Sequence, residues 1–208
     1  MCFSPAASFA ASLSLGTAGV ANLRQIRQRR EWPLALVPLL LGFQQLLEGL
    51  VWLSFKAPLV NLVASKIFVF FAYALWPAYI PWAVLLVEPS ATRKKFLWPL
   101  TVAGFFIGLY GFWNIAFYPT PVAVVCRSIG YVVPVLIPLF GLGYVFVCSV
   151  ACLISSYRWI NLLGLAVFGS FIMAFTFFYQ TGTSVWCFFA ALLSFFIYFH
   201  FRSLRLKK

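Results

Sequence analysis

Seven long apolar stretches, almost free of charged side chains, constrain this chain more than any other feature of its sequence. They cover residues 5–23, 33–55, 67–87, 96–118, 131–155, 159–179 and 185–201. A bilayer core about 30 Å thick needs roughly 20 apolar residues in a helix. Because lipid offers no hydrogen-bond partner to the backbone, each stretch must be helical. We therefore expect an all-α integral membrane protein, a bundle of seven transmembrane helices in a single domain over residues 1–208.

Composition excludes an ordinary soluble protein. The chain is 64% hydrophobic and only 9% charged, too few charges for the surface of a soluble domain. Its acidic residues are Glu31, Glu48 and Glu88, with no Asp, which excludes most carboxylate-rich catalytic sites. The segments between the apolar stretches are short, so any activity must lie within the bundle or at its two faces.

The positive-inside rule fixes the expected orientation. Twelve of the 15 basic residues fall on one side: Arg24, Arg27, Arg29, Arg30, Arg93, Lys94, Lys95, Arg158, Arg202, Arg205, Lys207 and Lys208. The other side holds Lys56, Lys66 and Arg127. We expect the amino terminus outside and the carboxyl terminus in the cytoplasm of a bacterial inner membrane.

The formal net charge of +12 would suggest nucleic acid in a soluble protein. Here the basic residues lie where anionic lipid headgroups attract them, so the expected partner is the cytoplasmic face of the bilayer and not nucleic acid. A more specific site for an anionic lipid or a protein at residues 24–30 is the open alternative.

Glu48 is the first candidate for a functional residue. It lies about 10 Å below the outer end of its stretch, and a carboxylate at that depth is costly. Gln44, Gln45 and Trp52 share its helix face because they lie three or four positions away. These four residues form a candidate ligand or proton site. The alternative is a protonated Glu48 that only holds neighbouring helices together.

Asn114 and Tyr179 extend this candidate site from the outward ends of other stretches. With Glu48 they would line an outward-facing polar vestibule. An ordinary belt of interfacial polar and aromatic side chains would have the same composition, so both interpretations stay open.

Pro77 and Pro81 lie four residues apart near the middle of the third stretch. Each proline lacks a backbone donor and leaves a carbonyl about one turn earlier without its helical partner. We expect a kink there. It would serve as a hinge, as in the broken helices of transporters, or remain a static bend.

The five cysteines divide by expected depth. Cys148 and Cys152 lie inside the fifth stretch and are expected to pack as small apolar residues. Cys2, Cys126 and Cys187 all fall at the outer face, where an oxidising compartment permits a disulfide, although the sequence does not choose a pair. No CxxC or HExxH spacing is present, so no metal site is predicted.

Several motifs resemble an uncharacterised family of small bacterial membrane proteins. The most specific are the opening Met1-Cys2-Phe3-Ser4 and the segment Trp186-Cys187-Phe188-Phe189-Ala190-Ala191. Gln44 to Gly49, Leu75-Trp76-Pro77 and Glu88-Pro89 agree with it. The resemblance covers the whole chain and implies a bacterial seven-span fold with no established activity. It also directs attention to Cys2, Glu48 and Cys187.

Three functions therefore remain open. The first is the handling of a small molecule or ion at an outward-facing polar site around Glu48. The second is a membrane-embedded, thiol-dependent enzyme or redox protein that uses Cys2 or Cys187 with Glu48. The third is a structural or accessory subunit whose polar residues join helices. No cofactor is indicated by any of them.

Overall fold

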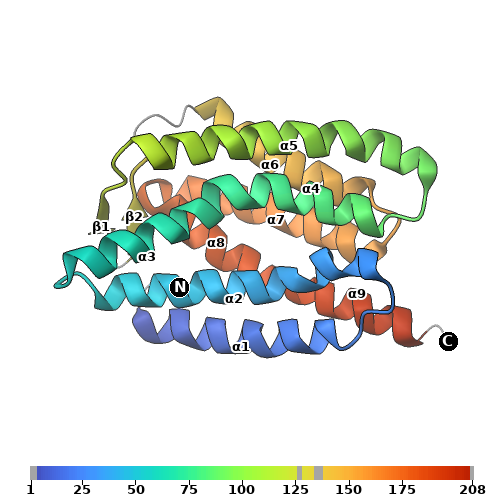
Figure 1. Ribbon diagram of the computed structural model, residues 1–208, viewed down its shortest axis with the longest axis horizontal. Helices are drawn as coiled ribbons and strands as arrows, with labels where there is room; N and C mark the ends of the chain where they lie inside the picture. Colours follow the sequence, from blue (N-terminus) through green and yellow to red (C-terminus); the bar gives the residue numbers. More distant parts are fainter. Residues whose placement is uncertain (1–3, 126–127, 134–137, 207–208) are drawn as a thin grey trace.

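The computed structural model describes residues 4–125, 128–133 and 138–206, most of them in helices that run along one axis (Figure 1). The α-helices are α1 (Pro5–Leu23), α2 (Trp32–Leu53), α3 (Pro58–Phe70), α4 (Trp76–Val87), α5 (Ala91–Phe117), α6 (Pro138–Ile154), α7 (Arg158–Phe177), α8 (Gly182–Leu193) and α9 (Phe195–Leu206). Two short 3-10 helices, η1 (Arg29–Glu31) and η3 (Tyr179–Thr181), and a π-helix, η2 (Phe71–Leu75), join some of them. Cys2 and Cys126 lie outside the described residues.

Six helical stretches are long and apolar enough to cross a membrane, counted over the described part of the chain. They are Pro5–Leu23, Arg29–Leu53, Pro58–Val87, Ala91–Phe117, Arg158–Phe177 and Tyr179–Leu206. A seventh apolar helix, Leu139–Ile154, is shorter. Large apolar side chains such as Phe105 and Phe106 of α5 point outwards. This architecture is compatible with a multi-pass membrane protein.

A small antiparallel sheet corrects the expectation of an all-α chain and of a helix beginning at residue 131. Strand β1 (Val122–Val125) pairs with β2 (Ser128–Tyr131), with Val122 opposite Tyr131. The helix expected at 131–155 begins at Pro138 instead. β-branched and aromatic residues favour a strand here, and the Tyr131 ring stacks on Phe68 with centroids 4.4 Å apart. Hydropathy alone cannot separate such a strand from a buried helix.

Two other helices begin earlier than the apolar runs suggested. The third stretch starts at Pro58 instead of residue 67, because Lys66 is accommodated inside α3, where its ammonium group donates to the carbonyl of Ile115 at 3.4 Å. Helix α5 starts at Ala91 instead of residue 96, because the Ser90 hydroxyl caps it by accepting from the Arg93 amide. Charged residues therefore lie within helices, and not only between them.

The last stretch is interrupted instead of continuous over residues 185–201. Helix α8 ends at Leu193 and α9 starts at Phe195, with Ser194 between them. The Ser194 hydroxyl donates to the Ala191 carbonyl at 2.6 Å and so competes with the helical ladder. This break lets α9 pack against both α7 and α1.

Glycines bring α5 against the third stretch where η2 meets α4. A Cβ on Gly104 would lie 2.1 Å from the Pro77 carbonyl oxygen, and one on Gly108 would lie 2.4 Å from that of Ala74. Only glycine allows this approach, as in small-residue helix contacts. Gly104 therefore holds α5 against α4, and Gly108 holds it against η2.

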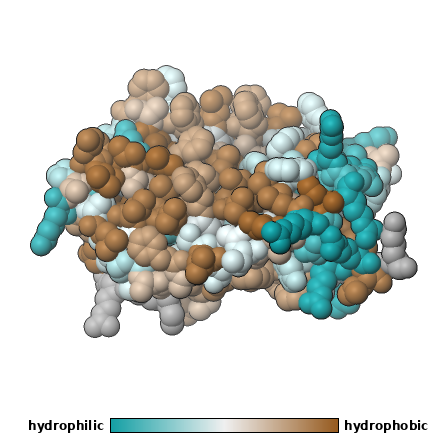
Figure 2. Space-filling view, turned by 60° about the horizontal axis from the view of Figure 1, so that its bottom comes forward, coloured by the Kyte–Doolittle hydropathy of each residue, from teal (hydrophilic) through white to brown (hydrophobic). Residues whose placement is uncertain are grey.

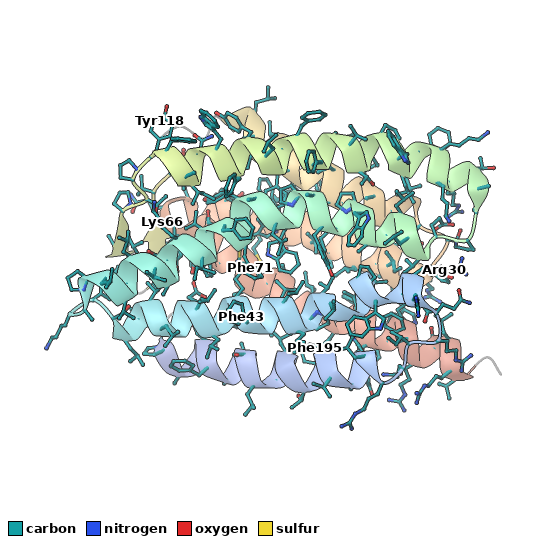
Figure 3. All side chains as sticks on the ribbon, in the orientation of Figure 1. Arg30, Phe43, Lys66, Phe71, Tyr118 and Phe195 are labelled. Carbon is teal, nitrogen blue, oxygen red and sulfur yellow. The ribbon has the colours of Figure 1, made fainter. Side chains whose placement is uncertain are left out.

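The long helical stretches alternate in direction, so their connections gather at two ends of the bundle. One end holds the connections after α1, α4 and α6 together with α9, and we call it the basic end. The opposite end holds the β1–β2 hairpin and the α2–α3 connection, and we call it the hairpin end (Figure 1). In Figure 3, Arg30 lies at the basic end and Lys66 toward the hairpin end.

Candidate functional site

Gln44 is the centre of a buried polar network between α2, α4 and α8. Its amide oxygen accepts a hydrogen bond of 2.7 Å from the indole nitrogen of Trp76. Its amide nitrogen donates to the Cys187 sulfur at 3.4 Å. The Cys148 thiol, on α6, in turn donates to the carbonyl of Trp76 at 3.6 Å. Gln44, which the sequence placed on the same helix face as Glu48, therefore connects three helices.

Glu48 lies one turn further along α2 and is fully buried. The hydroxyl of Ser184, at the start of α8, donates to its Oε1. Ser184 and Cys187 are three positions apart and so lie on the same face of α8. The two contacts, Glu48 with Ser184 and Gln44 with Cys187, form a double polar connection between α2 and α8.

Gln45 and Trp52 also belong to α2, but their polar atoms differ from those of Gln44 and Glu48 in their hydrogen bonding. The Gln45 side chain is fully buried, and neither amide atom has a hydrogen-bond partner among the described residues. The indole nitrogen of Trp52 is likewise buried without an acceptor there. The hydroxyl of Ser8 on α1, also fully buried, has no hydrogen-bond partner in the part of the chain that the structure describes. Gly49 of α2 packs on the Phe9 ring of α1, so Ser8, which precedes Phe9, lies near the turn of α2 that carries Glu48.

A cavity of about 570 Å³, which we call the aromatic cavity, opens near the hairpin end. It lies between α6, α7, α8, η2 and β2. Its described lining residues are Ala72, Tyr73, Tyr131, Val132, Val133, Phe140, Gly141, Leu142, Tyr144, Phe171, Phe175, Tyr179, Gln180, Thr183, Trp186 and Cys187. The volume falls within the range of small-molecule sites, about 300–1,000 Å³.

A second, much smaller cavity of about 60 Å³ lies beside the first, toward the basic end. Tyr144, Trp186 and Cys187 line both cavities and therefore form the partition between them. The Tyr144 and Trp186 rings meet edge to face with centroids 4.9 Å apart. Beyond the partition the walls include Cys152, Leu163, Ser194 and Ile197, and they are almost entirely apolar.

The predicted vestibule is corrected in two respects. Glu48 does not line the aromatic cavity; it lies behind the wall that Cys187 forms. Tyr179 lies at the cavity and is 82% exposed. Asn114 is buried in α5, where its amide nitrogen donates to the Tyr110 carbonyl at 2.8 Å, and it lines neither cavity. The structure therefore brings Glu48, Gln44 and Cys187 together but leaves Asn114 apart.

Pro77 is the second residue of α4, and Trp76 alone separates it from the end of the π-helix η2. A π-helical turn inside an α-helix is uncommon and is frequent at functional sites. It turns Tyr73 toward the aromatic cavity, where the phenol lies 2.5 Å from the Thr183 hydroxyl oxygen. On the neighbouring turns, Phe71 packs on Phe43 of α2 (Figure 3), with ring centroids 5.7 Å apart. A hinge at Pro77 and Pro81 stays a prediction.

The cysteines that can be placed are all reduced. Cys148, Cys152 and Cys187 are buried free thiols, so Cys187 forms no disulfide in this structure. The predicted bridge at the outer face would have to use Cys2 and Cys126, which lie outside the described residues. Within the described part of the chain, no three His, Cys, Asp or Glu side chains gather into a group that would hold a metal ion.

At the basic end, Glu88 links the α4–α5 connection to the α6–α7 connection. Its carboxylate accepts from the Ser156 backbone at 2.7 Å, from the Ser156 hydroxyl and from the Ser90 backbone at 3.0 Å. Burial raises the pKa of this carboxyl, but these hydrogen bonds outweigh it and hold the pKa below its ordinary value of 4.5. Arg93 donates beside it to the Ser155 carbonyl at 2.6 Å.

Sequence reasoning missed the aromatic half of the site. Tyr73, Tyr144, Thr183 and Trp186 come from three helices that no local pattern relates. The adjacency of Trp186 to Cys187 was the one usable signal for these side chains. The others are brought together by tertiary packing alone.

A comparison with family models places these observations in context. The model described as "Family of unknown function (DUF6629)" matches residues 1–208. No curated protein and no solved structure matches the chain.

Proposed function

The chain belongs to this family of unknown function, and we propose that it is a multi-pass protein of the bacterial inner membrane that binds a small molecule in its aromatic cavity. The amino terminus and the hairpin end face outwards in this proposal, and the basic end faces the cytoplasm. Ten of the basic residues that the structure describes belong to the basic end, and hydrophilic side chains gather there in Figure 2. Anionic headgroups of the inner leaflet are their proposed partners.

Cys187 is the observation that carries the proposal. Its side chain lines the aromatic cavity and at the same time accepts a hydrogen bond from Gln44. A molecule in the cavity therefore contacts the wall position that is connected to the buried polar network of Gln44 and Glu48. Polar groups at this depth are costly and are retained mainly where they serve a site.

Carriage of the bound molecule is the second candidate. The small cavity beyond Tyr144 and Trp186 favours it, because a second space lies on the basic-end side of that partition. Thiol-dependent catalysis has less support. The hydrogen bond that the structure gives the Cys187 sulfur comes from an amide, and an amide cannot act as a general base.

Gly141 provides a direct test. It lines the aromatic cavity, and a Cβ built on it meets nothing within 4 Å. Gly141→Leu therefore adds a bulky side chain at the cavity lining and narrows the cavity, with no close contact at its Cβ. Gly169→Leu on α7 is the matched control, since a Cβ there also meets nothing within 4 Å and Gly169 lines neither cavity.

The measurement is the small-molecule content of purified protein, determined by native mass spectrometry after mild detergent extraction. We expect one bound molecule in the wild type and in Gly169→Leu, and loss of that molecule in Gly141→Leu. Equal content in all three proteins, or none in the wild type, would contradict the proposal.

A further inference from the structure

We infer that the ligand of the aromatic cavity is a neutral, planar molecule that carries hydrogen-bond acceptors, of the chemical class of the quinones. This inference rests on the proposed function, because it assigns a ligand class to the same cavity.

The charge of the ligand follows from the lining. None of the 16 described lining residues is Asp, Glu, Lys, Arg or His. An ion placed in such a site would lose its hydration without gaining an opposite charge, which costs several kcal/mol or more. The bound molecule is therefore neutral.

The planarity of the ligand follows from the aromatic walls. Half of the lining residues, eight of 16, are Phe, Tyr or Trp. Around Trp186, the Phe171 ring lies edge-on at 5.1 Å and the Tyr144 ring at 4.9 Å. This arrangement leaves ring faces for stacking by a flat molecule. A flexible acyl chain would gain contact area but could not stack on these ring faces.

The acceptor groups of the ligand follow from the hydroxyl pair of Tyr73 and Thr183. The two oxygens lie 2.5 Å apart, and either can be the donor. Two hydroxyls carry two hydrogens, and one hydrogen suffices for the bond between them, so the second can be donated into the cavity. A quinone carbonyl is a suitable acceptor for it.

Tryptophan fluorescence gives the test. Menadione, a methylated naphthoquinone, should quench the wild-type protein in nanodiscs saturably. The compound 2-methylnaphthalene has the same rings without carbonyls and should bind about tenfold more weakly, the effect of one lost hydrogen bond. Its binding is read by displacement of menadione.

Matched variants locate the binding. Trp186→Phe should lose most of the saturable quenching, whereas Trp113→Phe, on the exposed face of α5, should keep it. The double variant Tyr73→Phe/Thr183→Val should weaken menadione about tenfold without affecting 2-methylnaphthalene, because either hydroxyl alone still has a hydrogen to donate. Thr183→Ser keeps the hydroxyl and should bind menadione as the wild type does.

The outcomes separate the two proposals. If both compounds bind equally and Gly141→Leu removes both, the cavity is a ligand site but the acceptor class is wrong. If a saturated fatty acid displaces the bound molecule and menadione does not, the planar class is wrong. If neither compound saturates and Gly141→Leu leaves the small-molecule content unchanged, the proposed function fails as well.

Discussion

The indole nitrogen of Trp76 lies 2.7 Å from the amide oxygen of Gln44, and this hydrogen bond joins α4 to α2 inside the bundle. Trp76→Phe keeps a ring but leaves the buried Gln44 oxygen without its donor. We expect the free energy of unfolding to fall by about 1–3 kcal/mol, the cost of a buried unsatisfied polar group. Thermal unfolding in detergent measures it. Trp113→Phe, at a position 57% exposed, should change it by less than about 0.5 kcal/mol.

Glu48→Gln should fold with a stability within about 1 kcal/mol of the wild type, because an amide oxygen can still accept from Ser184. Glu48→Leu removes the acceptor and should cost about 1–3 kcal/mol. The same unfolding assay compares the two variants. Equal losses in both would show that the charge of Glu48, and not its hydrogen bond to Ser184, stabilises the fold.

Gly104→Ala should separate α5 from α4, since the new Cβ would lie 2.1 Å from the Pro77 carbonyl oxygen. We expect a destabilisation of about 1–3 kcal/mol, typical of overpacking. Gly16→Ala is the control, because a Cβ there meets nothing within 4 Å. It should leave stability unchanged or raise it by up to about 1 kcal/mol through helix propensity. Similar effects of both substitutions would refute the close α4–α5 contact.

The mostly helical character of the fold could be predicted from the sequence, because the lengths of the apolar stretches determine where long helices can form. The sequence could not show the β1–β2 hairpin, since a run through Tyr131 has the hydropathy of a helix and becomes a strand only by pairing with Val122. Nor could it show the break at Ser194, where no glycine or proline stands.

For the site, the spacing of Gln44 and Glu48 along α2 is all that the sequence offers, and a ligand or proton site there stays a prediction. Their partners Trp76, Ser184 and Cys187 depend on how α4 and α8 pack against α2, which no local pattern states. Asn114 shows another limit: the sequence places it along a helix, but the direction of its side chain around the helix axis, toward the Tyr110 carbonyl and away from the network, depends on packing.

Acid should weaken the basic end through Glu88. Its pKa in the folded protein lies below the ordinary value of 4.5, so its ionised form stabilises the fold above that value. This contribution is lost as the pH falls below 4.5 and through the folded pKa. The melting temperature of the wild type should therefore drop in this range more than that of Glu88→Gln, whose side chain cannot ionise. Parallel profiles would contradict the role of Glu88.

The proposed orientation predicts which surface cysteines react from outside. In a background with Cys2 and Cys126 replaced by serine, Lys56→Cys at the hairpin end should react with a membrane-impermeant maleimide in intact cells. Lys95→Cys at the basic end should react only after permeabilisation. Labelling in the opposite order would reverse the orientation.

The most direct measurement of the central claim is an experimental structure of the protein in lipid, determined with menadione. The account predicts ring-shaped density in the aromatic cavity against Trp186, with a carbonyl within hydrogen-bond reach of Tyr73 or Thr183. A cavity without such density at saturating menadione, or one filled by the acyl chain of a phospholipid, would contradict it.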